Sequence, residues 1–265
     1  MTTFSFIGAG KMGEAILRAL LKRGFLQPSQ VILSDVDLER LHELSDKYKV
    51  RVTTDNLVAA READVILLAV KPQTHATVLP QIAEALDEDK VLISIAMGKS
   101  TESIETYLNG PTQVIRVMPN TPAMVSASIS AISYNEVVRP ESREMVRGMF
   151  SALGEVVEVE EGMQDEVGAI SGCGPAYFYL MVEALSDAGV RIGLDRSLAT
   201  RIATETMIGS GMMLKETGLH PAQLRDMVTS PGGTTIAALE VLEEHSFRAA
   251  VMKAVQAALR RAREV

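Results

Sequence analysis

The feature that most constrains the fold is a short apolar run followed at once by a glycine-rich turn and a helical segment. Thr2–Ile7 predicts a strand, Gly8–Gly13 has the spacing G-x-G-x-x-G, and Glu14–Arg23 is an apolar helical segment. In this order the glycines permit a tight turn, close approach of the backbone to a pyrophosphate, and close packing of helix on strand. The glycine spacing alone is a weak signal, so its weight comes from the strand and helix that flank it.

Further apolar runs follow at intervals that leave room for a helix between them. The later predicted strands lie at 31–33, 50–52, 63–70, 91–96, 114–117, 127–134 and 155–159. The near-continuous run at 63–70 is typical of a central parallel strand that is covered on both faces. Strands that alternate with helices predict an α/β fold with a Rossmann-like, doubly wound, mainly parallel sheet.

Polar residues follow several of these strands, at the carboxyl edge where open α/β sheets bind ligands. Ser34 and Asp35 follow the second strand, about twenty residues beyond the glycines, where a contact to an adenosine ribose is expected. Lys71-Pro72 ends the 63–70 run. Asn120 lies between two prolines, where an exposed amide would meet a ligand; the alternative for the prolines is a rigid turn.

The second half of the chain has helical rather than strand periodicity. The predicted helices there lie at 167–170, 176–192, 198–215 and from 247 to the end. We therefore expect a dinucleotide-binding domain over residues 1–160 and an all-helical domain over residues 161–265. The long helices are apolar around much of their surface, which predicts self-association.

A break between two helical segments carries a second candidate site. Ser230–Thr235 has the sequence Ser-Pro-Gly-Gly-Thr-Thr, and a helix that begins after Gly233 leaves its first backbone N–H groups unpaired. Such an end attracts a carboxylate or a phosphate. The alternative is an ordinary capped helix, with Thr234 or Thr235 as the cap.

Composition excludes several classes of partner. The net charge of −8 and the absence of a long basic run argue against nucleic acid. The first residues lack a signal-peptide pattern, and no run of about 18 apolar residues predicts a membrane span. Cys173 is the only cysteine and the four histidines are scattered, so we expect a cytoplasmic protein without a bound metal.

Five motifs occur in order over almost the whole chain: Phe6–Gly13, Ala69–Pro72, Met118–Pro122, Ser171–Tyr177 and Asp226–Thr235. With them the chain resembles the pyrroline-5-carboxylate reductases, which catalyse the last step of proline biosynthesis. The Asp226–Thr235 motif is the most specific of the five. The resemblance implies NAD(P)H-dependent reduction of 1-pyrroline-5-carboxylate to L-proline. It also implies a helical C-terminal domain that forms a dimer or a higher oligomer, with the substrate site at a subunit interface.

The resemblance also implies roles for individual residues. Thr235 would be the catalytic hydrogen-bond partner of the ring nitrogen, and the substrate carboxylate and imine would be held by Ser230, Gly232, Gly233, Thr234 and Thr235. The predicted cofactor-binding residues are Gly8, Ala9, Gly10, Lys11, Met12, Gly13, Ser34, Asp35, Asn56, Ala69, Val70, Lys71, Pro72, Ala96, Met97 and Asn120. Cys173 is interpreted as a packing residue rather than a nucleophile.

The chemistry of the residues favours an imine over an alcohol or a ketone. Hydride transfer to a carbonyl needs an acid, usually Lys or His, and neither occurs from Met163 to Asp195. A cyclic imine can enter already protonated, so it needs no strong acid. The alternatives are another NAD(P)H-dependent imine or hydroxyacid oxidoreductase of the same architecture, and a non-catalytic dinucleotide sensor. The sensor would have no use for the hydroxyl-rich turn.

The choice of cofactor is the point at which residues and resemblance disagree. The family commonly uses NADPH, whereas the carboxylates of Asp35 and Asp37 near the ribose favour the free 2′-hydroxyl of NADH. Asp37 is better explained as the N-cap of a helix, and Arg40 or Lys11 would be available to meet a phosphate. We predict NADP, with NAD as the alternative.

Overall fold

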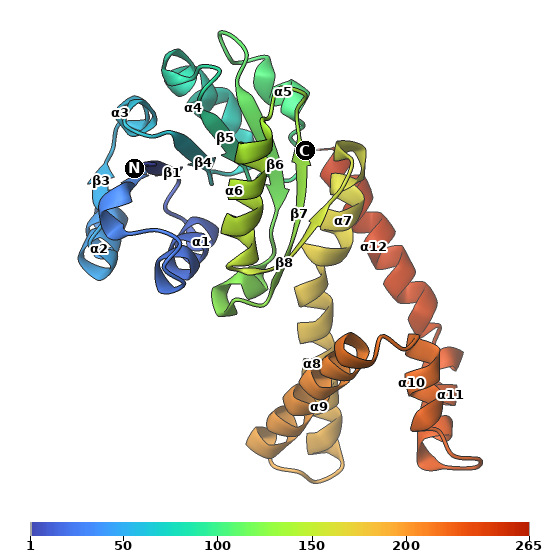
Figure 1. Ribbon diagram of the computed structural model, residues 1–265. Helices are drawn as coiled ribbons and strands as arrows, with labels where there is room; N and C mark the ends of the chain where they lie inside the picture. Colours follow the sequence, from blue (N-terminus) through green and yellow to red (C-terminus); the bar gives the residue numbers. More distant parts are fainter. Residues whose placement is uncertain (1, 265) are drawn as a thin grey trace. The chain divides into compact units, whose positions relative to one another are not determined.

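The computed structural model describes residues 2–264, with a sheet in the first part of the chain and helices in the second (Figure 1). The strands are β1 (Phe4–Ile7), β2 (Val31–Ser34), β3 (Arg51–Thr53), β4 (Val65–Leu68), β5 (Val91–Ser94), β6 (Gln113–Met118), β7 (Ser128–Tyr134) and β8 (Gly154–Glu158). The α-helices are α1 (Lys11–Lys22), α2 (Leu38–Tyr48), α3 (Asn56–Arg61), α4 (His75–Ile82), α5 (Thr101–Glu105), α6 (Pro140–Ser151), α7 (Gln164–Ser171), α8 (Gly174–Arg191), α9 (Arg196–Thr217), α10 (Pro221–Met227), α11 (Thr234–Glu244) and α12 (Phe247–Arg263).

The chain divides into two units, of which the first is discontinuous in sequence. The sheet unit comprises Met1–Cys173 and Ala258–Val265, and the helical unit comprises Gly174–Ala257. The last turns of α12 therefore belong to the sheet unit. There the ion pair of Arg263 with Glu166 holds them to α7, with 2.5 Å between Nη2 and Oε1.

The sheet has eight strands in the order β3-β2-β1-β4-β5-β6-β7-β8. Neighbouring strands are parallel from β3 to β6, β7 is antiparallel to β6, and β8 is parallel to β7. The strand order reverses between β1 and β4, and a ligand-binding crevice is expected at that point, outside the carboxyl ends of the strands. The predicted doubly wound, mainly parallel sheet is confirmed.

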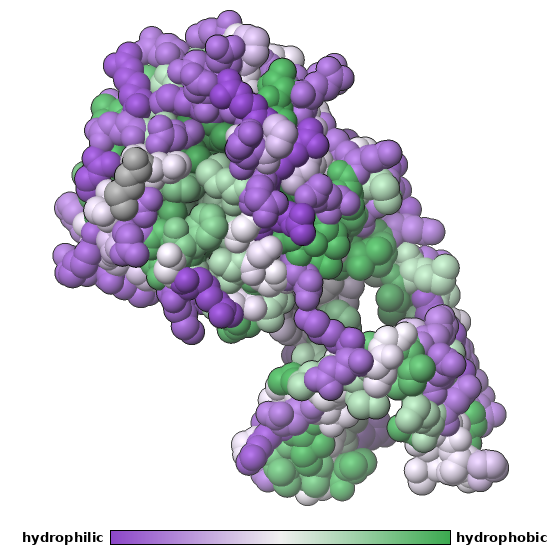
Figure 2. Space-filling model, viewed as in Figure 1, coloured by the Kyte–Doolittle hydropathy of each residue, from purple (hydrophilic) through white to green (hydrophobic). Residues whose placement is uncertain are grey.

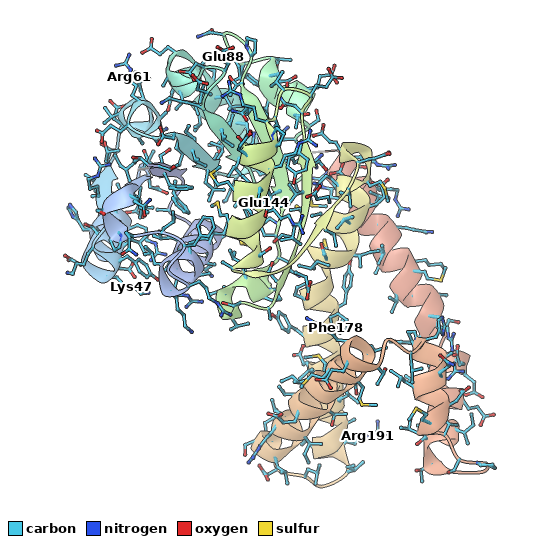
Figure 3. The ribbon with its side chains drawn as sticks, in the orientation of Figure 1. Lys47, Arg61, Glu88, Glu144, Phe178 and Arg191 are labelled. Atoms are coloured by element: carbon cyan, nitrogen blue, oxygen red, sulfur yellow. The ribbon has the colours of Figure 1, made fainter. Side chains whose placement is uncertain are left out.

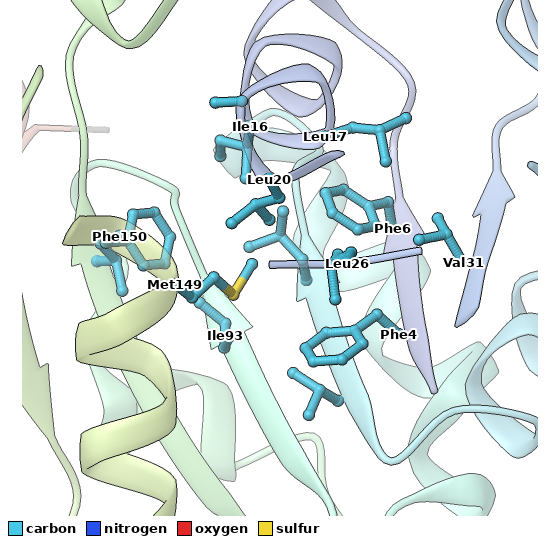
Figure 4. Packing of buried hydrophobic residues seen from close by; sticks show 14 of the residues in the cluster. Phe4, Phe6, Ile16, Leu17, Leu20, Leu26, Val31, Ile93, Met149 and Phe150 are labelled. Atoms are coloured by element: carbon cyan, nitrogen blue, oxygen red, sulfur yellow. The ribbon is translucent and has the colours of Figure 1, made fainter. Parts of the chain in front are cut away.

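The central strands are buried on both faces because successive side chains point to opposite sides of a sheet. In β4, Val65 and Leu67 join one apolar cluster, while Ile66 and Leu68 join the other. Figure 4 shows the first cluster, in which Leu20 of α1 and Met149 of α6 lie with other buried side chains around β1. Burial of these side chains fixes the position of α1, and hence of the glycine turn before it.

Helix α7 is part of the sheet unit although it lies just after the predicted domain boundary at residue 160. Gln164 is fully buried, and its Nε2 donates to Ser133 Oγ of β7 at 2.9 Å. The buried Arg116 of β6 donates from Nη2 to Asp165 Oδ1 at 2.6 Å. These contacts join the start of the helical half of the sequence to the sheet.

The helical unit leaves large apolar side chains in solvent. Helices α8 and α9 approach closely at Gly189, where a Cβ would lie 2.8 Å from Cβ of Ala199. Elsewhere on α8, Phe178 is 61 % exposed and Leu180 is 67 % exposed. Phe178 is labelled in Figure 3, and Figure 2 shows hydrophobic side chains gathered over the helical unit. A surface of this kind marks a site of association.

Within residues 2–264, no helix has both the length and the apolar composition that a membrane span needs.

Candidate functional site

The glycine turn between β1 and α1 is shaped by contacts with the end of β4. Gly8 has φ +103°, which favours glycine, and a Cβ there would lie 2.8 Å from the carbonyl carbon of Ala69. A Cβ on Gly13 would lie 2.5 Å from the carbonyl oxygen of Gly8. Gly10 differs, because a Cβ there would meet no atom within 4 Å. The fold therefore requires glycine at positions 8 and 13 but leaves open space beside Gly10.

The open space lies at the N-terminus of α1. Gly10 is the N-cap, and no side chain caps this helix. The backbone N–H groups of residues 11–13 donate no hydrogen bond among those described, as expected for a first helical turn. Unpaired N–H groups beside an unhindered glycine fit a pyrophosphate, which binds at such helix ends. The residues of this turn therefore fit a dinucleotide.

Asp35 of the β2–α2 turn and Arg40 of α2 contact the glycine turn, whereas Asp37 caps its own helix. Asp37 is the N-cap of α2 and accepts from the Arg40 backbone N–H at 3.0 Å, so the predicted cap is confirmed. Asp35 accepts from the Ala9 N–H through Oδ2 at 2.6 Å. Arg40, which the sequence suggested for a phosphate, instead donates to the Ala9 carbonyl and contacts Glu14.

Ser34 and Asn56 form a polar pair beyond this turn. Ser34 is fully buried, and its hydroxyl donates to Asn56 Oδ1 at 2.7 Å. Asn56 Nδ2 in turn donates to Gln81 Oε1 at 2.7 Å. The structure thus brings together two residues that lie far apart in the sequence and were both predicted to contact the cofactor.

A pocket of about 360 Å³ lies at the carboxyl edge of the sheet, within the sheet unit. Its predicted cofactor residues are Met12, Ala69, Val70, Lys71, Pro72, Ala96, Met97 and Asn120. The lining residues absent from the predicted site are Ile95, Met118, Pro119, Thr121, Gly172 and Cys173. Most of these belong to the Met118–Pro122 and Ser171–Tyr177 motifs, so the signal was present in the sequence but had not been assigned to the site.

Asn120 corrects one expectation. The sequence predicted an exposed amide, but this residue is only 8 % exposed. Its Nδ2 donates to the Ser171 carbonyl at 3.1 Å, and its Oδ1 accepts from the Ile129 N–H at 3.2 Å. The amide is used to join the pocket rim to β7 and to the end of α7, because a buried amide needs partners.

The Ser230–Thr235 turn lies in the helical unit, between α10 and α11. Gly232 has φ +66°, and the N-cap of α11 is Gly233, without a side-chain cap. The predicted alternative of a threonine cap is therefore wrong, since Thr234 and Thr235 are the first residues of the helix itself. The backbone N–H groups of residues 234–236 donate no described hydrogen bond.

The hydroxyls of this turn are not used by the fold. No hydrogen bond of the Ser230, Thr234 or Thr235 side chain occurs among those described for residues 2–264. Ser230 and Thr234 are exposed and Thr235 is half-buried. An uncapped helix end with free hydroxyls can bind a carboxylate through N–H groups and a ring N–H through a hydroxyl oxygen.

Helix α8 lacks the side chains that usually supply the acid for carbonyl reduction. Helix α8 contains no Lys and no His. Within residues 2–264, no cluster of three or more His, Cys, Asp or Glu side chains is arranged to hold a metal ion.

Sequence and structure comparisons identify relatives of both halves. Residues 160–265 match a family profile described as "Pyrroline-5-carboxylate reductase dimerisation", and residues 3–98 match "NADP oxidoreductase coenzyme F420-dependent". The chain is 43% identical over 260 residues to a pyrroline-5-carboxylate reductase of Methanosarcina acetivorans, which covers 98% of this chain and 96% of the relative. It is 45% identical over 259 residues to the Synechocystis enzyme of that name, with 98% and 96% covered.

A solved structure is similar over nearly the full length. The Plasmodium falciparum pyrroline carboxylate reductase with NADP bound has a TM-score of 0.92 and 33% sequence identity, and the match covers 99% of this chain and 97% of that one. The motifs, the fold and the relatives agree over almost the whole length. The chain belongs to the pyrroline-5-carboxylate reductase family.

Proposed function

We propose that this chain reduces 1-pyrroline-5-carboxylate to L-proline, with NADPH as the reductant. The observation that carries the proposal is the N-terminus of α11, which begins after Gly232 at φ +66° and has no side-chain cap. The substrate is a small anion with an imine in its ring. Its carboxylate needs N–H donors, and its ring nitrogen needs a hydroxyl.

The residues of the turn divide these tasks. The N–H groups of residues 234–236 bind the carboxylate, with Ser230, Gly232, Gly233 and Thr234 forming the walls of the turn. Thr235 accepts a hydrogen bond from the protonated ring nitrogen and thereby orients the ring. The chemistry supplied by the dinucleotide is donation of a hydride from its reduced nicotinamide. Because the nitrogen enters with its proton, the chain needs to align the ring rather than to supply an acid.

In the sheet unit, the dinucleotide is held by the glycine turn and the pocket. The N–H groups of residues 11–13 and the space beside Gly10 fit its pyrophosphate. Residues 69–72 and 96–97 line the pocket, where they would exclude water from the nicotinamide. The NADP-bound relative from Plasmodium supports this use of the pocket.

A hydroxyacid oxidoreductase is the weaker alternative. Reduction of a ketone requires a group that donates a proton to the oxygen, and α8 offers neither Lys nor His. The absence of these residues from that helix favours the imine.

The test is turnover of the purified enzyme with 1-pyrroline-5-carboxylate and NADPH, followed by loss of the reduced nicotinamide absorbance and by chiral detection of proline. We expect L-proline in amounts equal to the NADPH oxidised. A panel of 2-keto acids and other cyclic imines serves as the comparison. Faster reduction of a keto acid than of the imine would overturn the proposal.

The assembly and the domain assignment belong to the same proposal. The apolar surface of the helical unit and the match to a dimerisation profile over residues 160–265 support self-association, with the substrate turn at a subunit interface in a dimer or a higher oligomer. Residues 1–160 supply the dinucleotide-binding function and residues 161–265 the dimerisation function, although α7 and the last turns of α12 pack with the sheet unit. The net charge of −8 supports the absence of nucleic acid, and the single cysteine supports a cytoplasmic location.

A further inference from the structure

We propose that Arg40 is a positioning residue that holds the glycine turn in the shape required by the dinucleotide, rather than a receptor for the phosphate of NADPH. The inference rests on the proposed function only in that the ligand is a dinucleotide. It concerns a residue outside the pocket, whose guanidinium acts through the backbone of Ala9.

The backbone of Ala9 is held on both sides, by Asp35 of the β2–α2 turn and by Arg40 of α2. Its N–H donates to Asp35 Oδ2 at 2.6 Å, and its carbonyl accepts from Arg40 Nε at 3.2 Å. The preceding N–H, of Gly8, donates to the Ser34 carbonyl at 2.7 Å. Two consecutive residues of the glycine turn are therefore fixed before any ligand arrives, while Gly10 and the N–H groups that follow stay open.

The guanidinium of Arg40 is itself fixed by carboxylates. Its Nη1 donates to Glu43 Oε2 at 2.6 Å, and its Nη2 contacts Glu14 of α1. All three guanidinium nitrogens are thus engaged, and the side chain is only 24% exposed. A 2′-phosphate that reached the two remaining N–H groups would lie beside the carboxylates of Glu14 and Glu43, which repel it.

Glu14 is the common partner that ties α2 to α1. Besides Arg40, it accepts from Lys47 Nζ at 2.9 Å and from Tyr48 Oη at 2.8 Å. Burial raises the pKa of Glu14, but the hydrogen bonds from Lys47, Tyr48 and Arg40 outweigh it and lower that pKa to about 2. The carboxylate of Glu14 is therefore charged near neutral pH, where it pairs with Arg40. Lys47 is labelled on α2 in Figure 3.

Because Arg40 acts through Ala9, its effect on NADPH and NADH should differ from that of a residue that binds the 2′-phosphate directly. The glycine turn faces the pyrophosphate, which NADPH and NADH share, whereas only NADPH carries the 2′-phosphate. When the turn already has its bound conformation, less conformational entropy is lost on binding, and this holds for both cofactors. Loss of Arg40 should therefore weaken both cofactors by the same factor.

The experiment compares Arg40→Gln with the wild-type enzyme by direct titration of NADPH and NADH, without the imine. We expect the Kd of each cofactor to rise about five-fold, as for one lost hydrogen bond, with equal factors for the two. In steady state the KM for either cofactor should rise in parallel, while kcat and the KM for the imine stay unchanged. Arg40→Lys keeps the charge near Glu14 but lacks the planar guanidinium. Its affinity for both cofactors should therefore stay below that of the wild type.

Arg61→Gln is the matched control. Arg61 ends α3, is labelled in Figure 3 and forms an exposed ion pair with Glu84 at 2.5 Å, with 60% of its side chain exposed. It has no contact with the glycine turn among those described, so both Kd values should equal those of the wild type.

A loss confined to NADPH would overturn the inference in favour of a phosphate contact, and unchanged binding of both cofactors would show that Arg40 has no role. If the thermal melt shows that Arg40→Gln does not fold, the Kd values for NADPH and NADH are compared in Arg40→Lys and Glu14→Gln instead. Because binding is measured without the imine, an enzyme that binds both cofactors but does not form proline would contradict the proposed function alone.

Discussion

Thr235 lies half-buried in the first turn of α11, and its hydroxyl has no described partner within residues 2–264. In the proposed site this hydroxyl meets the ring nitrogen. Thr235→Ala should therefore cost about 1–3 kcal/mol of transition-state stabilisation, which is roughly a 5- to 150-fold loss in kcat/KM. Thr235→Ser, which keeps the hydroxyl, should recover most of the activity. An unchanged kcat and KM in Thr235→Ala would contradict the assigned role.

His75, at the start of α4, gives a prediction about pH and stability. It is 2 % exposed, and neither ring nitrogen has a hydrogen-bond partner. Burial, with the nearby charge of Lys99, lowers the pKa of His75 from 6.5 to about 4. Between these values the unfolded chain binds a proton that the native protein does not. The free energy of unfolding therefore falls as the pH drops through this window.

The measurement is urea unfolding at pH 7 and at pH 5 for the wild type and for His75→Phe. Between pH 7 and pH 5 the free energy of unfolding should fall by about 2 kcal/mol more in the wild type than in the variant. His42→Gln, a change at an exposed histidine of α2, is the control and should retain the wild-type pH dependence. Equal pH dependence in the wild type and His75→Phe would show that His75 is protonated in the native state.

Single residues also show where the sequence could and could not predict the site. The N-cap role of Asp37 follows from a local rule, because a cap bonds within its own helix, and it was predicted correctly. The burial of Asn120 depends on Ile129 of the next strand and on Ser171, which is 51 residues away in the sequence. Two of the three partners of Arg40, Glu14 and Ala9, likewise lie on α1 and in the glycine turn. Residue types and spacing do not reveal such distant partners.

At the scale of elements, alanine substitution at two glycines of the turn from β1 to α1 should have different effects, one on binding and the other on stability. A Cβ on Gly10 meets nothing within 4 Å, whereas one on Gly13 lies 2.5 Å from the Gly8 carbonyl oxygen. Gly10→Ala should keep the wild-type melting temperature but weaken dinucleotide binding, because its methyl group occupies the pyrophosphate space. Gly13→Ala should lower the melting temperature, because the backbone must shift.

Thermal melts and cofactor titration of the two glycine variants check this expectation. Full dinucleotide affinity in Gly10→Ala would place the pyrophosphate elsewhere, and an unchanged melting temperature in Gly13→Ala would contradict the close packing of α1.

The elements themselves were predicted with unequal success, for a physical reason. Strands β1, β2, β4, β5 and β6 were recognised because buried parallel strands are apolar runs bounded by turns. Strand β3 was also recognised, although it is short and partly exposed. The antiparallel direction of β7 was not specified by its sequence. That direction depends on the short η4 turn (Thr121–Val125), which returns the chain directly beside β6. A connection that short does not allow the crossover that a parallel neighbour requires.

For the whole molecule, the exposed apolar side chains of α8 predict the effect of a charge on assembly. Phe178 and Leu180 are 61 % and 67 % exposed. Leu180→Glu would bury a charge in a contact between copies, so we expect dissociation of the oligomer in sedimentation experiments. Val137→Glu, at a residue of the sheet unit that is 46% exposed, is the control and should leave the assembly intact. An unchanged sedimentation coefficient for Leu180→Glu would exclude this part of α8 from the interface.

The return of α12 to the sheet unit has a consequence for the order in which the protein folds during synthesis. A Cβ on Gly98 would lie 2.9 Å from the Ala262 carbonyl oxygen, and Glu166 pairs with Arg263. Residues near 98 and 166 leave the ribosome long before residues 262 and 263, and domains generally fold as units from the N-terminal end. During synthesis, the surface of the sheet unit around residues 98 and 166 therefore stays exposed until the entire helical segment has been translated.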